Sequence, residues 1–103
     1  MKVFISQPMK GKTNEQIKQE RNALVEAIEK KGDIVIDSIL SEPPSELKTE
    51  ALWYLGESIK LLATVDAIVL MKDWTLAKGC LIERHCADQY GVKILNENYY
   101  LNS

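Results

Sequence analysis

Short apolar runs alternate with longer amphipathic segments along the whole chain. Runs of β-branched, aliphatic and aromatic residues predict strands at 1–5, 34–36, 65–71 and 92–95. Apolar residues at steps of three and four predict helices over 14–31, 45–63 and 79–90. Strands that alternate with helices favour parallel pairing through right-handed crossovers. We therefore expect one α/β domain over residues 1–103, a small doubly wound (flavodoxin/Rossmann-like) parallel sheet of four to five strands with helices on both faces.

The expected ends of these helices carry recognisable signals. Thr13, followed three residues later by Gln16, forms a capping-box pattern before the first helix. Gly32 and Gly91 follow the first and third helices as candidate left-handed caps. Gly56 lies inside the second helix, where glycine costs up to about 1 kcal/mol relative to alanine. Close packing, or a ligand that approaches the backbone, would explain this glycine.

Composition narrows the function classes. The 103 residues are 46% hydrophobic and 27% charged with a net charge of −2, as in an ordinary folded domain, and no positive surplus is available for a nucleic-acid polymer. A single nucleoside or nucleotide remains possible because it needs only a local pocket. Cys80 and Cys86 lie about 120° apart around the third helix, so we expect them not to pair. Without a signal peptide or long apolar run, we expect a cytoplasmic protein with no membrane contact.

Ligands of open parallel sheets sit beyond the carboxyl ends of the strands, which points to the loops at 6–12, 37–44 and 72–78. Residues 6–13 match a phosphate-binding loop except that Ser6 replaces the first glycine and Pro8 lacks an N–H group. Two interpretations stay open. Gly11 and Thr13 serve the turn and the helix cap, or the loop lines a pocket.

In the second of these interpretations the pocket-lining side chains of the first loop are Ser6, Gln7 and Met9. The loop at 72–78 and the helix after it offer further candidates. Glu83 lies near the start of the third helix and can point into the crevice, or it can be a surface charge that complements the helix dipole. Gly79 would let a ligand approach the helix start.

Trp74 could stack on a base or belong to the core. His85 lies about 200° around the helix from Glu83, so the two cannot share one site, and packing or solvation is its expected state. No cluster of His, Cys, Asp and Glu has the spacing of a metal site, and no cofactor is indicated.

Several short motifs together resemble one family over nearly the whole chain. They are Val3-Phe4-Ile5-Ser6-Gln7-Pro8-Met9 with Gly11, Trp53-Tyr54-Leu55 with Ser58, Val65-Asp66-Ala67, and Gly79-Cys80 with Glu83, Ala87 and Tyr90-Gly91. In this order and spacing they resemble a DUF4406-type member of the nucleoside 2-deoxyribosyltransferase-like superfamily, which is common in phages and bacteria.

The resemblance implies that Glu83 is a nucleophile that attacks the anomeric carbon of a 2-deoxyribonucleoside and releases the base. The chain departs from the classical enzymes at two positions. Ser58 stands where they carry an aspartate, and Ala77 replaces a small polar or acidic residue. Asp73 could supply the missing acid or be a solvated loop carboxylate, whereas Asp66 begins its strand at the wrong end of the sheet and is expected to be structural.

The resemblance and the chemistry together leave two function classes. One is an N-glycosidase or deoxyribosyltransferase acting on a small nucleoside or nucleotide, and the other is a non-catalytic module that binds or senses such a ligand. A sheet this narrow also favours a homodimer or larger homo-oligomer. Tyr99, Tyr100 and Leu101 could be buried there, or fold back onto their own subunit.

Overall fold

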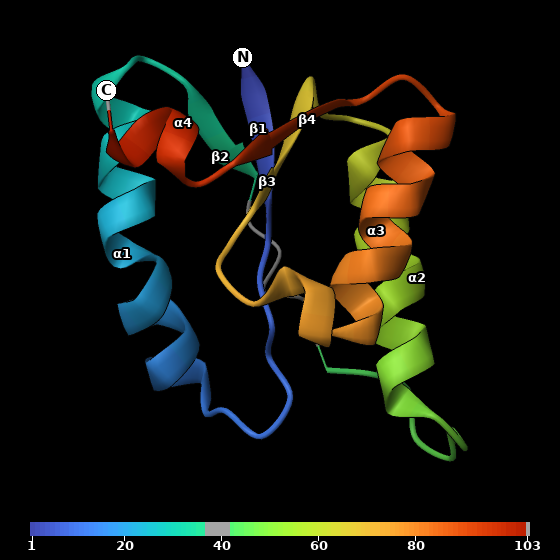
Figure 1. Ribbon diagram of the computed structural model, residues 1–103. Coiled ribbons are helices and arrows are strands. Elements are labelled where there is room, and N and C mark those ends of the chain that lie inside the picture. Colours follow the sequence, from blue (N-terminus) through green and yellow to red (C-terminus); the bar gives the residue numbers. More distant parts are fainter. Residues whose placement is uncertain (37–41, 103) are drawn as a thin grey trace.

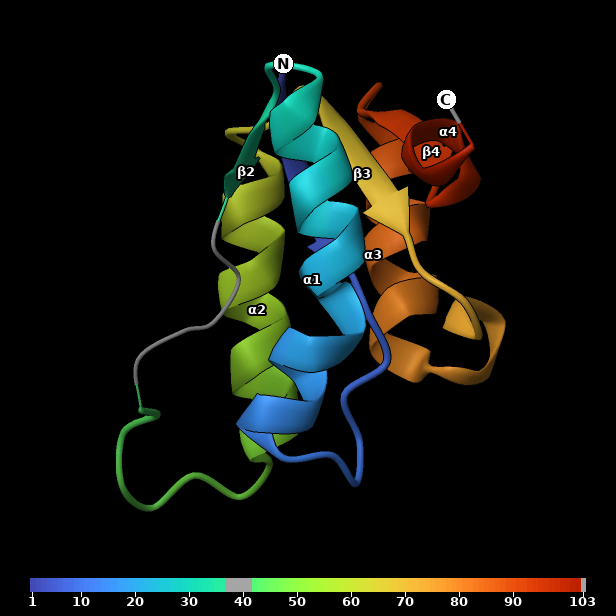
Figure 2. The same ribbon diagram turned by 90° about the vertical axis from the view of Figure 1, so that its left-hand side faces the viewer.

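The structure is a computed structural model that describes residues 1–36 and 42–102. The described chain runs β1 (Lys2–Ser6), α1 (Asn14–Lys30), β2 (Ile34–Ile36), α2 (Glu50–Leu62), β3 (Ala67–Leu70), a 3-10 turn (Trp74–Leu76), α3 (Lys78–Gln89), β4 (Lys93–Asn96) and α4 (Asn98–Leu101). Figure 1 shows α1 and α4 on one side of the strands and α2 and α3 on the other, and Figure 2 looks at the molecule from the side of α1. The expected α/β architecture with helices on both faces is confirmed, with four strands in the described residues.

All strand pairs are parallel, in the order β2-β1-β3-β4. The central pair, β1 and β3, aligns Val3 with Ala67 and Ser6 with Leu70. The chain winds outward in both directions from this pair, so the topological switch point lies between the carboxyl ends of β1 and β3. Ligands of this class of sheet bind in the crevice there.

Alternate side chains of the central strands build two cores. Val3 and Ile5 pack with Leu24 and Ile28 of α1 on one face, and Phe4 packs on the other face with residues of α2, β3 and α3. Because side chains alternate along a strand, Ser6 faces α2 and α3, as Phe4 does. The strand thereby carries a polar group to the end of an otherwise apolar core.

The signals at the helix ends behave as predicted. Thr13 and Gln16 form the complete capping box. Gly32 and Gly91 have φ of +85° and +75° after α1 and α3, the left-handed conformation that glycine adopts without strain. Strand and helix bounds differ from the predictions by one or two residues at most ends, the usual scatter at frayed termini.

Three features depart further from the sequence prediction. The second helix begins at Glu50 rather than residue 45, and Glu46 has a φ of +69°, which an α-helix does not accommodate. The loop at 72–78 contains a 3-10 turn, and the tail contains α4. Both missed helices are short, so neither shows a repeating apolar pattern.

The tail folds back onto its own subunit through Tyr100. This side chain is 2% exposed, and its hydroxyl donates a 2.8 Å hydrogen bond to Asp33. Asp33 also accepts a 2.7 Å hydrogen bond from the amino group of Met1. Tyr99 and Leu101 remain 45% and 43% exposed, so only part of the aromatic tail is covered.

Other expectations have mixed outcomes. A Cβ atom on Gly56 would meet no atom within 4 Å, so close packing, the first of the two explanations for that glycine, is wrong. Asp66 accepts a 2.7 Å hydrogen bond from the backbone N–H of Lys2, which confirms a structural role. Within the described residues, Cys80 and Cys86 are free thiols, and no helix is long and apolar enough to cross a membrane.

Candidate functional site

Glu83 lies at the carboxyl edge of the sheet with its side chain turned inward. The residue is 8% exposed, on the α3 face that packs against α2 and the strands. Its Oε1 accepts a 2.7 Å hydrogen bond from the Ser6 hydroxyl, and the Ser58 hydroxyl of α2 also hydrogen-bonds to it. Cys80, one turn earlier on α3, is 2% exposed and hydrogen-bonds with Ser6. We call these four residues the Glu83 cluster.

Opposing effects set the ionisation of Glu83. Burial raises the pKa of this carboxyl above its ordinary value because the protein interior disfavours the charged form. Hydrogen bonds from the Ser6 and Ser58 hydroxyls oppose that rise by stabilising the carboxylate. A carboxylate that is held by two hydroxyls and poorly hydrated is well suited to attack or stabilise an electron-poor carbon. Glu83 is therefore no ordinary surface charge complementing a helix dipole.

Gln7 follows Ser6 directly but points to the α1 side of the sheet. Its Nε2 donates to the backbone oxygen of Ile17 at 3.0 Å and to Glu20 at 3.3 Å. Its Oε1 accepts a 2.8 Å hydrogen bond from Nε of Arg21, a buried side chain of α1. The Gln7 amide is thus held by α1, with one lone pair of Oε1 left for a further hydrogen bond.

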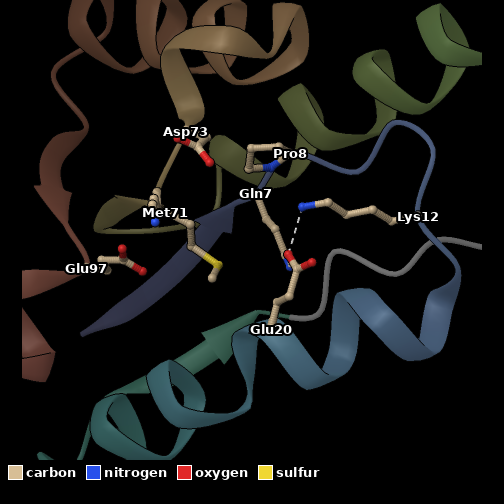
Figure 3. Close-up of a pocket in the computed structure, with 8 residues that line it drawn as sticks. Gln7, Pro8, Lys12, Glu20, Met71, Asp73 and Glu97 are labelled. Atoms are coloured by element: carbon tan, nitrogen blue, oxygen red, sulfur yellow. Dashed lines mark hydrogen bonds and ion pairs between the residues drawn. The ribbon is translucent and has the colours of Figure 1, made fainter.

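A cavity of about 340 Å³ opens beside Gln7, on the α1 side of the carboxyl edge. Gln7 and Lys12 line it from the first loop and Glu20 from α1, while Met71, Lys72, Asp73 and Glu97 line it from the segments after β3 and β4. Figure 3 shows the side chains of Asp73, Glu97 and Glu20 around Met71 and Gln7. We call this cavity the α1-side hollow.

Two contacts fix the walls of the hollow. The backbone N–H of Glu97 donates a 3.1 Å hydrogen bond to the oxygen of Leu70, which holds the end of β4 beside β3. Lys12 forms a 2.8 Å ion pair with Glu20, the dashed line of Figure 3. The Lys12 ammonium lowers the pKa of the Glu20 carboxyl.

The predicted site residues fall into two groups on the two faces of the sheet. Ser6, Ser58 and Glu83 meet in the Glu83 cluster, whereas Gln7 and Asp73 line the α1-side hollow. Ser6 and Gln7 are consecutive, and the Ser6 backbone oxygen accepts a 3.0 Å hydrogen bond from Met71. The two groups therefore flank the ends of the same central strands. Among the described residues, no hydrogen bond or ion pair joins Asp73 to Glu83.

The remaining predicted residues lie around these groups. Met9 is 38% exposed in the first loop. Trp74 packs against the α2 and α3 core, and the Arg84 guanidinium lies 5.5 Å from its ring centre. Gly79 is half-buried in the first turn of α3, and a Cβ atom there would meet nothing within 4 Å. His85 is exposed on α3.

The first loop does not have the features of a triphosphate-binding loop. Its Lys12 is paired with Glu20, and Thr13 caps α1. Gly11, with a φ of +77°, makes the turn. The structural roles predicted for Gly11 and Thr13 are confirmed, while Ser6 and Gln7 face the two polar groups described above. The loop at 37–44 was the second predicted ligand loop, and its residues 37–41 lie outside the described residues.

Several residues that the fold places at the carboxyl edge of the sheet were not among the predicted site residues. Cys80 was not predicted to belong to the site, although it lies one turn before Glu83 on the same helix face. The helical spacing could have pointed to Arg21. This residue falls on the same face of α1 as the apolar residues Ile17, Leu24 and Ile28, so its charged side chain must be buried with them and needs a partner. Glu97 has no local signal, since its place depends on the pairing of β4 with β3.

A second cavity of about 580 Å³ lies at the opposite, amino edge of the sheet. Its walls are mainly apolar and include Ile59, Leu62, Ala87 and Val92. Asp66 also borders it, with its carboxylate bound by the Lys2 N–H group. The ionisable and hydroxyl groups described above lie at the carboxyl edge, which is also the edge used by ligands of doubly wound sheets.

Among the described residues, no group of three or more His, Cys, Asp and Glu side chains is placed to hold a metal ion. Comparison with known proteins adds one finding. No curated protein and no solved structure matched the chain. The model of one family, described as a domain of unknown function (DUF4406), matches residues 1–96, which is nearly the whole chain. The chain therefore belongs to the DUF4406 family.

Proposed function

We propose that this protein cleaves the N-glycosidic bond of a small 2-deoxynucleoside or deoxynucleotide, as an N-glycosidase or deoxyribosyltransferase. The observation that carries the proposal is the buried Glu83 carboxylate, held by the hydroxyls of Ser6 and Ser58 at the switch point of the sheet. The resemblance to the nucleoside 2-deoxyribosyltransferase-like superfamily supports the same reaction. In that superfamily the glutamate that matches Glu83 is the nucleophile.

The proposed reaction begins with attack of a Glu83 oxygen on C1′ of the sugar. The new C1′–O bond forms as the C–N bond to the base breaks, and the bonding electron pair leaves with the base. The base takes up a proton, which in our proposal comes from Asp73 or from water. Water or a second base then attacks C1′ and frees the Glu83 carboxylate.

The other predicted residues have supporting roles in this proposal. Met9 in the first loop and Gly79 in the first turn of α3 would lie beside the incoming ligand. Trp74 packs against the core of α2 and α3. Gln7 presents one lone pair of its fixed amide. The reaction needs no cofactor. A homodimer or larger homo-oligomer is part of the same proposal, since Met9, Leu52, Leu76 and Ile82 are exposed apolar side chains.

The alternative proposal is a non-catalytic module that binds or senses a nucleoside or nucleotide. Ser58 favours this alternative, because it stands where the classical enzymes carry an aspartate and its hydroxyl cannot protonate a leaving base. Such a module would keep the crevice and use Glu83 as a hydrogen-bond acceptor for its ligand. The reaction described above and this module make opposite predictions for turnover.

The test is chromatographic detection of free base after incubation with deoxynucleosides and deoxynucleoside monophosphates, with and without an acceptor base. We expect wild-type protein to release or exchange a base and Glu83→Ala to lose this activity by about a thousandfold or more, as for loss of a nucleophile. Asp73→Asn should lose activity mainly on bases that leave poorly. Saturable binding without turnover would reject glycosyl transfer in favour of the sensing module.

A further inference from the structure

The α1-side hollow is lined by more negative than positive side chains, which is unusual for a site beside a nucleotide. Its walls carry the carboxylates of Glu20, Asp73 and Glu97 and the ammonium groups of Lys12 and Lys72. Lys12 is already paired with Glu20 at 2.8 Å. Lys72, Asp73 and Glu97 add one positive and two negative charges, so the hollow has a formal charge of −1.

The start of α1, the helix start on this side, is a poor site for an anion because it is already capped and carries Glu15 in its first turn. Helix N-termini bind phosphate through free backbone N–H groups. At the start of α1, however, the Thr13 hydroxyl accepts from the Gln16 N–H, and the Gln16 side chain accepts from the Thr13 N–H. On the other side of β1 lies the Glu83 carboxylate, a further negative group at the same edge.

The same walls are well suited to uncharged hydroxyl groups. Carboxylates accept hydrogen bonds from sugar hydroxyls, and the Lys72 ammonium can donate to a hydroxyl oxygen. The Gln7 amide, which α1 holds in place, also lines the hollow. A volume of about 340 Å³ lies within the usual range of small-molecule sites.

We infer that the α1-side hollow binds the hydroxyl-bearing end of an uncharged nucleoside and disfavours a phosphate, so that nucleosides are preferred over their 5′-monophosphates. The identity of the ligand as a nucleoside rests on the proposed function, whereas the selection against a phosphate rests on the charges of the hollow. A 5′-phosphate carries a charge of about −1.5 to −2 near neutral pH, which the net negative charge of the hollow repels.

The experiment measures binding by calorimetry in the Glu83→Gln background, in which the proposed reaction cannot consume the ligand. The probes are the common 2′-deoxynucleosides and their 5′-monophosphates, at low and at high salt. Glu97→Gln, added to this background, removes one charge of the hollow. Asp88→Asn is the matched control, because Asp88 is exposed near the far end of α3, at the amino edge of the sheet.

We expect nucleosides to bind about tenfold more tightly than their monophosphates at low salt, with a smaller difference at high salt because salt screens the repulsion. Glu97→Gln should reduce this preference by about threefold or more, and Asp88→Asn should leave it unchanged. Equal or tighter binding of monophosphates, an equal effect of Glu97→Gln on both ligands, or binding of neither would overturn the inference. Selective nucleoside binding without base release by wild-type protein would uphold it and reject the proposed reaction.

Discussion

The hydroxyl of Ser6 donates a 2.7 Å hydrogen bond to the carboxylate of Glu83, although 77 positions separate the two residues in the chain. Ser6 ends a central strand and Glu83 lies on the helix that follows the neighbouring strand. The bond therefore crosses the switch point and fixes the one carboxylate that the proposed reaction requires.

Ser6→Ala should shift the activity of the protein to higher pH. Burial raises the pKa of Glu83, and the Ser6 and Ser58 hydroxyls lower it by stabilising the carboxylate. Without the Ser6 hydroxyl the pKa rises further, so less carboxylate is present at a given pH. We expect about a tenfold loss of kcat/KM at pH 7, the order expected for one hydrogen bond to a charged group, and partial recovery at alkaline pH.

The pH profile of kcat/KM for base release checks this prediction. Ser45→Ala is the matched control, since Ser45 is exposed in the turn before α2. An acid limb at the same pH in Ser6→Ala and wild-type protein would contradict a role of Ser6 in the ionisation of Glu83.

Glu83 should lower the stability of the protein above its unfolded-state pKa, which is near 4.5. The folded-state pKa is raised, so the native protein binds more protons than the unfolded chain. The contribution of Glu83 to stability is then present below pH 4.5 and is lost as the pH rises through the folded-state pKa. Glu83→Gln keeps an acceptor for Ser6 and should be about 1 kcal/mol more stable than wild type at pH 7.

Urea unfolding of wild type and Glu83→Gln at several pH values measures this difference. The two proteins should converge in stability as the pH falls below 4.5. A variant that is less stable than wild type at pH 7 would show that the carboxylate stabilises the fold.

Most of the fold could be predicted from local patterns. The nearly continuous apolar run at 65–71 predicted the central strand, and Thr13 predicted the start of α1. The tail helix could not be found this way because it is too short to show a repeating apolar pattern, and the approach of Glu97 to the end of β3 depends on the pairing of β4 with β3. For the site, the sequence pointed to Ser6, Ser58 and Glu83, which meet, but gave no sign that Gln7 and Asp73 lie on the other face.

Gly56→Ala should stabilise the protein by about 0.5–1 kcal/mol. Gly56 lies in the interior of α2, and an added Cβ atom would meet nothing within 4 Å. Alanine therefore gains helix propensity without a steric cost. Gly91→Ala is the contrasting variant and should be destabilising, because Gly91 has a φ of +75°.

Chemical unfolding measures both variants, and binding of the substrate provides a second readout. If Gly56→Ala is more stable but binds substrate poorly, then a ligand approaches the α2 backbone at this position. If Gly56→Ala is no more stable than wild type, then the low helix propensity of Gly56 does not limit the stability of the protein.

Tyr100→Phe should lower the Tm by a few degrees. The Tyr100 ring is 2% exposed, and its hydroxyl donates a 2.8 Å hydrogen bond to Asp33, which together with burial raises the pKa of Tyr100. The phenylalanine variant keeps the ring and loses the bond. Tyr99→Phe is the control, since Tyr99 is 45% exposed and should leave the Tm nearly unchanged. Calorimetry of the three proteins tests the prediction, and equal effects of the two substitutions would refute it.

The pairing of β1 with β3 has a consequence for biosynthesis. During translation, β1 can pair first with β2 through the α1 connection, because both strands are made early. The other edge of β1 stays unpaired until residues 67–70 have been synthesised, and Ser6 has no Glu83 partner until α3 follows. A nascent chain that stalls before this point would expose one edge of β1, a strand whose residues 3–6 are buried in the native protein, and such edges are surfaces on which chaperones act and aggregation begins.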